Sequence, residues 1–348
     1  MIAIKKSTQT LVVIGPGGVG KTTLSASIAI GKSYEGLKVL VLTIDPSLRL
    51  TQTLGFKPDG QIQKIKLKSC KGELYASTLN HEEIFNQFLS VFNGTKNKNS
   101  KKNEFKKNKL FDKLTKELSS SQDFTTLYAL LEQSEKNTYD LIIVDTPPAQ
   151  HTWAFLKSPE KLSQLFTENH ISIFSLFNTE SNSITNRFFQ SGTQQVLGVL
   201  EKLTGSDFIS ELKDFFSLIK NWQKPINRIV IDCQKLLVSQ KTEFIMVTDF
   251  DINRVSSAAE ISQKIYNEGY NLGHLILNRV PSWLEETSPY KNKQIELFRK
   301  LNLSTLNNFT AKVDQIHFNL NIYKSYNISH NVDYENLYKI YTDLIQIK

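Results

Sequence analysis

Short apolar runs alternate with amphipathic stretches along much of the chain, and each pattern predicts one kind of element. Continuous apolar runs of this length are typical of buried strands. They are Thr10–Ile14, Leu37–Ile44, Leu74–Leu79, Asp140–Val144, Glu243–Thr248 and Leu272–Leu277, with Gln315–Asn321 as a weaker last candidate. Helices are expected over Thr22–Tyr34, over Val255–Glu268 and from Asp333 onward. The alternation predicts an α/β fold with a mostly parallel sheet flanked by helices.

Two long stretches interrupt this alternation. Residues 81–136 are polar and helical in spacing, and residues 153–240 show helical spacing throughout. Part of one apolar face in the second stretch is formed by Ile226, Ile229, Val230, Cys233 and Leu237. We therefore expect one domain over residues 1–348, with a helical, lysine-rich insertion at 81–136 and an inserted helical subdomain at 153–240.

Composition narrows the class of protein. The chain has 348 residues, of which 40% are hydrophobic and 22% charged, so it can bury a full core without disulfides. Its two cysteines, Cys70 and Cys233, lie far apart, which argues against a cysteine-based zinc or redox centre and fits a reducing compartment. No run reaches the roughly 18 apolar residues of a membrane helix. We expect a cytoplasmic protein.

The positive charge is concentrated in one segment. Between Thr95 and Lys113 eight lysines stand against two acidic residues, and they account for most of the net charge of +8. Such a run is typical of an arm that binds nucleic acid or anionic lipid, or of a solvated Lys/Asn-rich loop. Only Phe105 is interleaved as an aromatic residue, which favours the loop and makes nucleic acid an unexpected partner.

A glycine-rich segment after the first strand fits the phosphate-loop pattern GxxxxGK[ST] from Gly15 to Thr22. The backbone N–H groups that can curl around phosphates belong to Gly17, Gly18, Val19 and Gly20, and the glycines permit this curl because they have no Cβ atom. Lys21 supplies a positive charge for the β- and γ-phosphates, and the Thr22 hydroxyl can bind Mg²⁺. The helix that follows directs its positive dipole end at the anion.

The same letters also fit the dinucleotide pattern GxGxxG, and Asp45 could then bind a ribose. The lysine and threonine directly after the last glycine have no function in a dinucleotide-binding fold. A second phosphate-side motif also occurs downstream. The sequence therefore favours an α/β P-loop NTPase over a dinucleotide enzyme.

Two acidic residues stand at the carboxyl ends of predicted strands. In open α/β sheets, ligands bind at this edge of the sheet. Asp45 could orient or deprotonate a water, or hold the water shell of a metal, but it could equally cap a helix. Asp145 ends an apolar strand in the Walker-B pattern and would hold Mg²⁺ through water beside Thr22. His151 follows Asp145 closely and is either a phosphate sensor or a structural histidine.

These motifs resemble the arsenical pump-driving and tail-anchored-protein-targeting ATPases, which belong to the deviant Walker-A group of P-loop ATPases. The matching segments are Gly17–Thr23, Asp45–Pro46, Asp145–Thr152 and Leu277–Pro281. The resemblance implies that Lys21, Thr22 and Thr23 bind phosphate and Mg²⁺. It further implies that Asp45 is catalytic, orienting the hydrolytic water near the metal, and that Asp145 supports the metal. Asn278 would hydrogen-bond adenine.

The resemblance also implies ATP and Mg²⁺ as cofactors, and a dimer with nucleotide at its interface. The dimer would be formed by two copies or with a paralogous ATPase. Hydrolysis would change the hold of the helical subdomain on a partner. The resemblance leaves open whether the partner is a membrane-associated protein. It therefore also leaves open whether this protein lies at the surface of a membrane.

One departure from the family pattern affects the phosphate loop. The family's signature lysine, which reaches across the dimer, is Pro16 here, and a basic residue absent from the usual first switch appears as Arg49. We hypothesise that Arg49 replaces the lost charge, although a solvated surface arginine explains it as well. The loss of the lysine also keeps open a weakly active regulatory subunit that pairs with a paralog. The lysine run keeps open a relative of the partitioning and septum-placement ATPases that would use the run to bind DNA or a membrane.

Overall fold

The computed structural model describes residues 1–44, 49–92, 122–147, 153, 155–160, 224–249, 251–280, 300, 304, 321–326 and 333–346. The chain divides into two compact units. The first comprises Met1–Asn80, Leu130–Leu156 and Lys235–Lys348, and the second comprises His81–Ala129 and Lys157–Gln234. The phosphate-loop segment belongs to the first unit.

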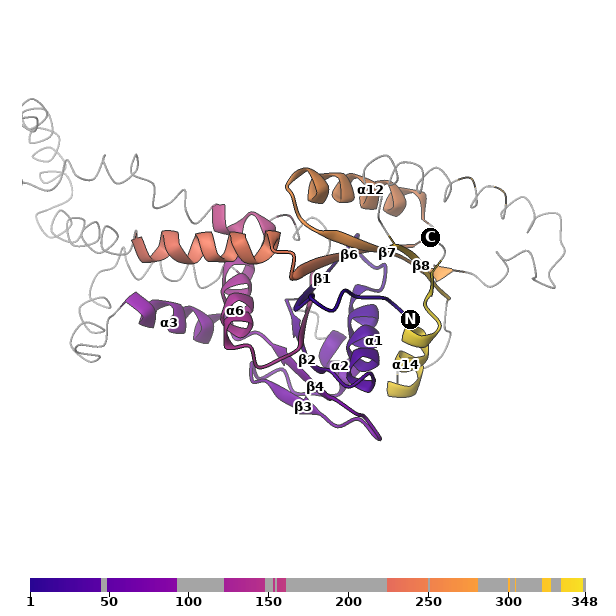
Figure 1. Ribbon diagram of the computed structural model, residues 1–348, viewed down its shortest axis with the longest axis horizontal. Coiled ribbons are helices and arrows are strands. Elements are labelled where there is room, and N and C mark those ends of the chain that lie inside the picture. The colour runs from indigo at the N-terminus through magenta and orange to yellow at the C-terminus, as the bar shows by residue number, and fades with distance from the viewer. Residues whose placement is uncertain are drawn as a thin grey trace, which may run out of the picture. The chain divides into compact units, whose positions relative to one another are not determined.

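The first unit is built on a nine-stranded sheet in the order β3-β4-β2-β5-β1-β6-β7-β8-β9 (Figure 1). Its strands are β1 Thr10–Ile14, β2 Lys38–Thr43, β3 Gln63–Ile65, β4 Glu73–Thr78, β5 Leu141–Asp145, β6 Thr242–Thr248, β7 Leu272–Val280, β8 Asn321–Tyr326 and β9 Ile345–Gln346. All pairs from β4 to β8 are parallel, whereas β3 and β9 pair antiparallel at the two edges. The predicted mostly parallel sheet is confirmed.

Most strand predictions agree with the structure to within a few residues. The last prediction, Gln315–Asn321, stays a prediction over residues 315–320, which lie outside the described residues, and the described strand β8 begins at its final residue, Asn321. The edge strands β3 and β9 were not predicted. They contain three and two residues, too few to show a hydrophobic period.

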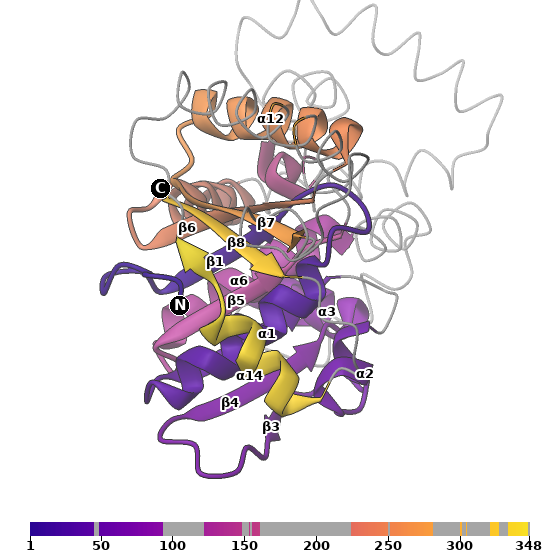
Figure 2. The same ribbon diagram turned by 90° about the vertical axis from the view of Figure 1, so that its right-hand side faces the viewer.

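Helices cover both faces of the sheet (Figures 1 and 2). One face carries α1 (Lys21–Tyr34), α2 (Arg49–Leu54) and α14 (Tyr334–Thr342), and the other carries α12 (Ile252–Asn267). Strands β1, β5 and β6 are buried at every position, which explains their continuous apolar runs. The parallel strands bring their carboxyl ends to one edge, where the glycine-rich loop follows β1.

Close packing of α14 on α1 supports the helix that begins at this loop. Ser27 donates a hydrogen bond to the carbonyl of Leu337 at 2.7 Å. A Cβ atom on Gly31 would lie 2.2 Å from Cδ1 of Tyr341, so the missing side chain permits the approach of α14. The position of α1 is therefore fixed by a helix near the other end of the chain.

The second unit contains a small aromatic core between α3 (His81–Phe92) and the first part of α6 (Gln122–Lys136). Phe88 lies edge-on to Phe124 and Tyr128, with ring centroids 4.9 and 5.3 Å apart. Both helices belong to the predicted insertion at 81–136. Residues 93–121 between them, including the lysine run, lie outside the described residues.

Only part of the predicted helical subdomain at 153–240 can be described. Residues 224–238 form a helix in which Ile226, Val230, Cys233 and Leu237 are buried, as their spacing predicts. The division into one P-loop domain with two inserted segments stays a prediction.

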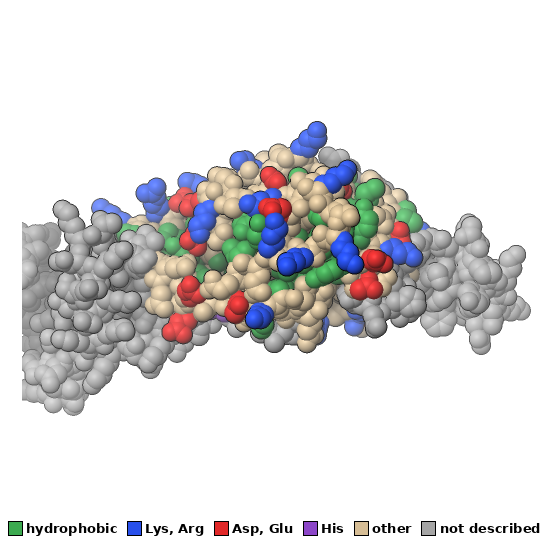
Figure 3. Space-filling view, turned by 90° about the horizontal axis from the view of Figure 1, so that it is seen from below, with side chains coloured by type: hydrophobic (Ala, Val, Ile, Leu, Met, Phe, Trp, Pro, Cys, Tyr) green, Lys and Arg blue, Asp and Glu red, His purple; other side chains and the backbone are tan. Residues whose placement is uncertain are grey.

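In the described part of the chain, no helix combines the length and apolar character needed to cross a membrane. On the face drawn in Figure 3, Lys and Arg side chains lie among Asp and Glu side chains.

A buried charged cluster joins β6 and β7 within the sheet. Glu243 and His274 are each 1% exposed, and Nε2 of His274 lies 3.3 Å from Oε1 of Glu243. Thr8 donates a hydrogen bond to the other carboxylate oxygen at 3.0 Å. Burial by itself raises the pKa of Glu243, but the contacts with His274 and Thr8 outweigh it, and the pKa lies below its ordinary value.

This cluster predicts a pH-dependent part of the stability. Because the folded pKa of Glu243 lies below the unfolded value of about 4.3, the ionised carboxylate stabilises the fold at neutral pH, and the contribution is lost as the pH falls through the folded pKa. Glu243→Gln should lower the free energy of unfolding at pH 7 by about 1–3 kcal/mol. Urea unfolding between pH 7 and pH 3 should show this deficit narrowing as the pH falls. A deficit that stays constant with pH would contradict the assignment.

Candidate functional site

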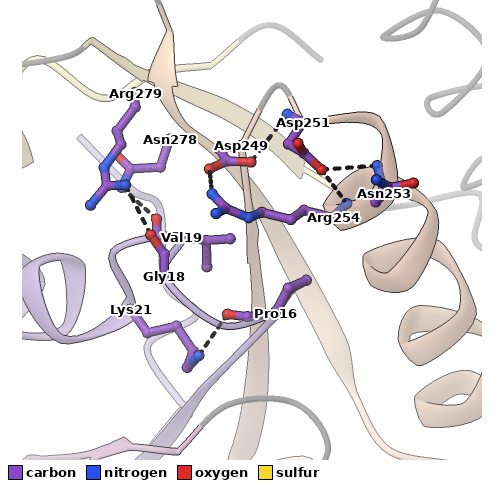
Figure 4. A network of polar contacts seen from close by, with 10 residues as sticks. All are labelled: Pro16, Gly18, Val19, Lys21, Asp249, Asp251, Asn253, Arg254, Asn278 and Arg279. Carbon is purple, nitrogen blue, oxygen red and sulfur yellow. Dashed lines mark hydrogen bonds and ion pairs between the residues drawn. The ribbon is translucent and has the colours of Figure 1, made fainter. Parts of the chain in front are cut away.

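A buried lysine occupies the glycine-rich loop between β1 and α1. Lys21, the first residue of α1, is only 7% exposed. Its Nζ donates hydrogen bonds to the carbonyls of Gly15 and Pro16, each at 2.9 Å, and Figure 4 draws the bond to Pro16. The loop therefore closes around a cation. An anion entering the loop would offer that cation stronger, charge-assisted bonds than the neutral carbonyls do.

The first turn of α1 has no side chain capping it. Its N-cap residue is Gly20, with a φ of 92° and no side-chain hydrogen bond. By contrast, α12 and α14 are capped by the carboxylates of Asp251 and Asp333. Uncapped N–H groups at a helix start, next to a lysine, are suited to bind phosphate oxygens. The hydroxyls of Thr22 and Thr23 lie in the same turn and are half-buried.

The end of β7 supports the loop from its other side (Figure 4). Asn278 is 7% exposed, and its Nδ2 donates to the carbonyl of Val19 at 2.8 Å. Arg279 is exposed, and its Nη1 donates to the carbonyl of Gly18 at 2.9 Å. Two neighbouring loop carbonyls are thus bound by two neighbouring residues of β7. The adenine-binding role of Asn278 stays a prediction, and the structure adds this contact with the loop.

A fully buried carboxylate lies at the end of β5, the strand next to β1. Asp145 pairs in register with Val13. Ser25 Oγ donates to one of its oxygens and Thr43 Oγ1 to the other, both at 3.3 Å. Carboxylate and hydroxyl oxygens are the ligand types that Mg²⁺ prefers. Asp145 and Thr22 thus offer ligand types that suit Mg²⁺, and the magnesium site formed by the two residues stays a prediction.

The two predicted switch segments are only partly described. Asp45 and His151 fall outside the described residues, so their predicted roles stay predictions. The residue before Asp45, Ile44, donates its N–H to the carbonyl of Asp145 at 3.1 Å. Thr146 donates its hydroxyl to the carbonyl of Val13 at 2.7 Å. The starts of both segments are thus tied to the strands around the loop.

Two arginines bear on the charge at the loop: Arg49, which the sequence suggested as a replacement for the lost lysine, and Arg254, which approaches Gly18. Arg49 is the exposed first residue of α2, and nothing described supports or excludes its predicted role. Arg254 of α12 forms an ion pair with Asp249, and its Nη2 would lie 3.7 Å from a Cβ on Gly18 (Figure 4). Sequence reasoning missed Arg254, because its approach to the loop joins segments far apart in the chain.

Two further polar residues near the site were missed, Ser25 and Thr43. Ser25 stands one helical turn after Lys21, so its spacing placed it on the same helix face. Thr43 ends a predicted strand on the edge where ligands gather. The sequence positions of Ser25 and Thr43 could therefore have identified both residues as candidates for the site. The pairing of both hydroxyls with Asp145 came only from the three-dimensional arrangement.

The contact between Gly20 and Asn278 predicts that Gly20 tolerates no side chain. A Cβ on Gly20 would lie 2.3 Å from Nδ2 of Asn278, and the residue also has a positive φ. Gly20→Ala should lower the free energy of unfolding by about 2–4 kcal/mol, from backbone strain and overpacking together. Gly36→Ala is the matched control, because Gly36 has a φ of +105° but nothing within 4 Å of an added Cβ. It should cost only about 1–2 kcal/mol.

Urea unfolding measures both effects. The double variant Gly20→Ala/Asn278→Ala should be less destabilised than the sum of its single variants, because the removed amide makes room for the methyl group. Equal losses for Gly20→Ala and Gly36→Ala would show that Asn278 does not limit the loop.

Comparison with curated proteins finds several similar ATPases. The chain is 25% identical over 280 residues to "ATPase GET3B" of Arabidopsis thaliana, covering 76% of this chain and 62% of that protein. It is 26% identical over 292 residues to "ATPase ASNA1 homolog" of Cryptosporidium parvum, covering 79% and 66%. It is also 28% identical over 156 residues to "Putative arsenical pump-driving ATPase 2" of Aquifex aeolicus, covering 44% and 50%.

The chain spans just under two thirds of the length of the first two of these relatives. The family model described as "Anion-transporting ATPase" matches residues 8–240, more than half of the 348 residues. That range includes the glycine-rich loop, Lys21 and Asp145. The structure agrees with this family match, because its glycine-rich loop closes around a lysine at the carboxyl edge of a parallel sheet. The chain belongs to the anion-transporting ATPase family.

Proposed function

We propose that this chain is a cytoplasmic ATPase that couples hydrolysis of Mg-ATP to the binding or release of a partner. The observation that carries the proposal is the buried Lys21 in its loop at the start of an uncapped helix. The fully buried carboxylate of Asp145 at the neighbouring strand end supports it. Membership of a family described as ATPases agrees with this chemistry.

Each predicted site residue has a task in this proposal. Phosphate oxygens would replace the carbonyls of Gly15 and Pro16 as partners of Lys21. The amides of Gly17, Gly18, Val19 and Gly20, with Thr22 and Thr23, would surround the phosphates. Mg²⁺, when bound, neutralises charge on the phosphates. Catalysis would then consist of positioning and charge neutralisation, with Asp45 orienting the attacking water.

The metal would be held by few protein groups. Thr22 would supply a hydroxyl ligand, and Asp145 would contribute through water, with Asp45 near the same water shell. Mg²⁺ keeps several waters and takes one or two protein ligands beside phosphate oxygens, so this small set is sufficient.

A route from nucleotide to partner leads through the segment that follows β5. Thr146 is hydrogen-bonded to β1, and farther along the segment Lys264 of α12 lies over the ring of Trp153, 5.9 Å from its centroid. Ordering of this segment by Mg-ATP would be passed to the helical subdomain at 153–240. The partner would be a second protein, either membrane-associated or not, and the ATPase would act as a homodimer or with a paralog.

Removal of the loop lysine tests the proposal. Lys21→Ala should lower ATP turnover by about a hundredfold or more, because a buried charge that stabilises the phosphates is lost. Tight ATP binding should be lost as well. Calorimetry and a phosphate-release assay measure the two effects.

Lys136→Ala is the matched control for this variant. Lys136 is half-exposed at the end of α6 and pairs with Glu132 at 3.1 Å, so its loss should leave both measurements unchanged. Circular dichroism should show both variants folded. Normal ATP affinity and turnover in folded Lys21→Ala would remove the basis of the proposal.

A second candidate function is a nucleotide-binding regulatory subunit with little hydrolysis of its own. The observation that favours it is Pro16, which offers the loop neither a charge nor an N–H group and contributes only its carbonyl to Lys21. Such a chain would depend on a paralog for activity.

Turnover measured at rising protein concentration separates the two functions. For an active homodimer the specific activity should increase with concentration and then reach a plateau, because dimers complete the site. Sedimentation of the same samples should show the dimer forming over that range. Specific activity that stays at background while the chain dimerises would favour the regulatory subunit.

A further inference from the structure

The backbone of Arg279 departs from its strand. Its φ is +57°, in the left-handed region that residues other than glycine rarely adopt. The other described non-glycine residues with positive φ, Ser69 and Asn137, lie in turns, whereas Arg279 lies in β7. The register between β7 and β8 shifts at this point, between Leu277 and Val280. Such a conformation costs free energy and persists where the surrounding structure requires it.

The unusual backbone brings two consecutive side chains to the same loop. In a regular strand, neighbouring side chains point to opposite faces. Here Asn278 and Arg279 both donate to the phosphate loop, to the carbonyls of Val19 and Gly18 at 2.8 and 2.9 Å (Figure 4). The left-handed residue thus places a guanidinium group at the rim of the loop.

The charge of Arg279 is available to a ligand. Among the ion pairs of the described residues, none includes Arg279, and its side chain is exposed. Arg254, the other arginine near Gly18, has its charge compensated by Asp249. The contact with Gly18 engages an edge nitrogen of the Arg279 guanidinium, so this hydrogen bond does not occupy the planar face that stacking would use.

The sheet order indicates which part of a nucleotide would lie there. Asp145, the carboxylate suited to the metal, is on β5, on one side of β1. Strands β6 and β7 lie on the other side of β1. If the γ-phosphate and Mg²⁺ are directed toward β5, the sugar and base extend toward β7, where Arg279 stands.

We propose that Arg279 binds the nucleobase by stacking its guanidinium plane on the ring, with the Gly18 carbonyl holding that plane in place. The inference rests on the proposed function and adds a base-binding residue to the same site. An arginine suits this task because its flat, weakly hydrated cation stacks on aromatic faces, which the ammonium group of lysine does less well.

Two ligands separate base binding from support of the loop. Isothermal titration calorimetry with Mg²⁺ would compare a non-hydrolysable ATP analogue, AMP-PNP, with inorganic tripolyphosphate, which has no base. Arg279→Ala should bind AMP-PNP roughly tenfold more weakly and tripolyphosphate as tightly as the wild type does. Arg279→Lys should fall between. Arg228→Ala is the matched control, because the Arg228 side chain is 86% exposed and far from the loop in sequence, and it should bind both ligands normally.

A glycine variant separates the side chain from the backbone. Arg279→Gly adopts a positive φ without strain, so it should show the same selective loss of AMP-PNP affinity as Arg279→Ala. The inference is overturned if both ligands weaken equally, if neither weakens, or if Arg279→Gly binds AMP-PNP normally. Wild-type protein that binds neither ligand would instead remove the proposed function, and the inference with it.

Discussion

The burial of one lysine in a loop of backbone carbonyls is the interaction on which the site depends. A buried ammonium group without partners is strongly unfavourable. The loop after β1 offers Lys21 the carbonyls of Gly15 and Pro16, both at 2.9 Å. These neutral acceptors satisfy the cation but are weaker than an anion would be. The folded chain therefore holds the Lys21 ammonium group inside a loop of backbone, where phosphate oxygens can replace the two carbonyls as its partners.

That loop keeps its shape because distant parts of the chain pack around it. On one side Asn278 and Arg279 bind the carbonyls of Val19 and Gly18. On the other, the hydroxyl groups that bind Asp145 come from α1 and β2. The helix that begins at the loop is packed against α14, near the end of the chain. A site whose supports come from so many segments forms only when the whole sheet has formed.

Much of the sheet and part of the site could be predicted from the sequence. Continuous apolar runs marked the central strands, because a parallel strand covered on both faces has few polar positions. The phosphate loop was recognisable because its glycines, Lys21 and Thr22 are neighbours in sequence. Asp145 could be placed because a strand end locates a side chain at the ligand-binding edge. The edge strands β3 and β9 were missed, since two- and three-residue strands show no hydrophobic period.

The sequence by itself therefore determined the order of strands and helices, the loop that suits phosphate, and the acid at the end of β5. These are local features that act through neighbouring residues and a regular period. Only the tertiary structure decided that Arg254 approaches Gly18, that Ser25 and Thr43 bind Asp145, and that Arg279 turns back to the loop with a positive φ. Contacts of this kind join residues far apart in the chain, and no local pattern records them, because they exist only once the sheet brings its strand ends together.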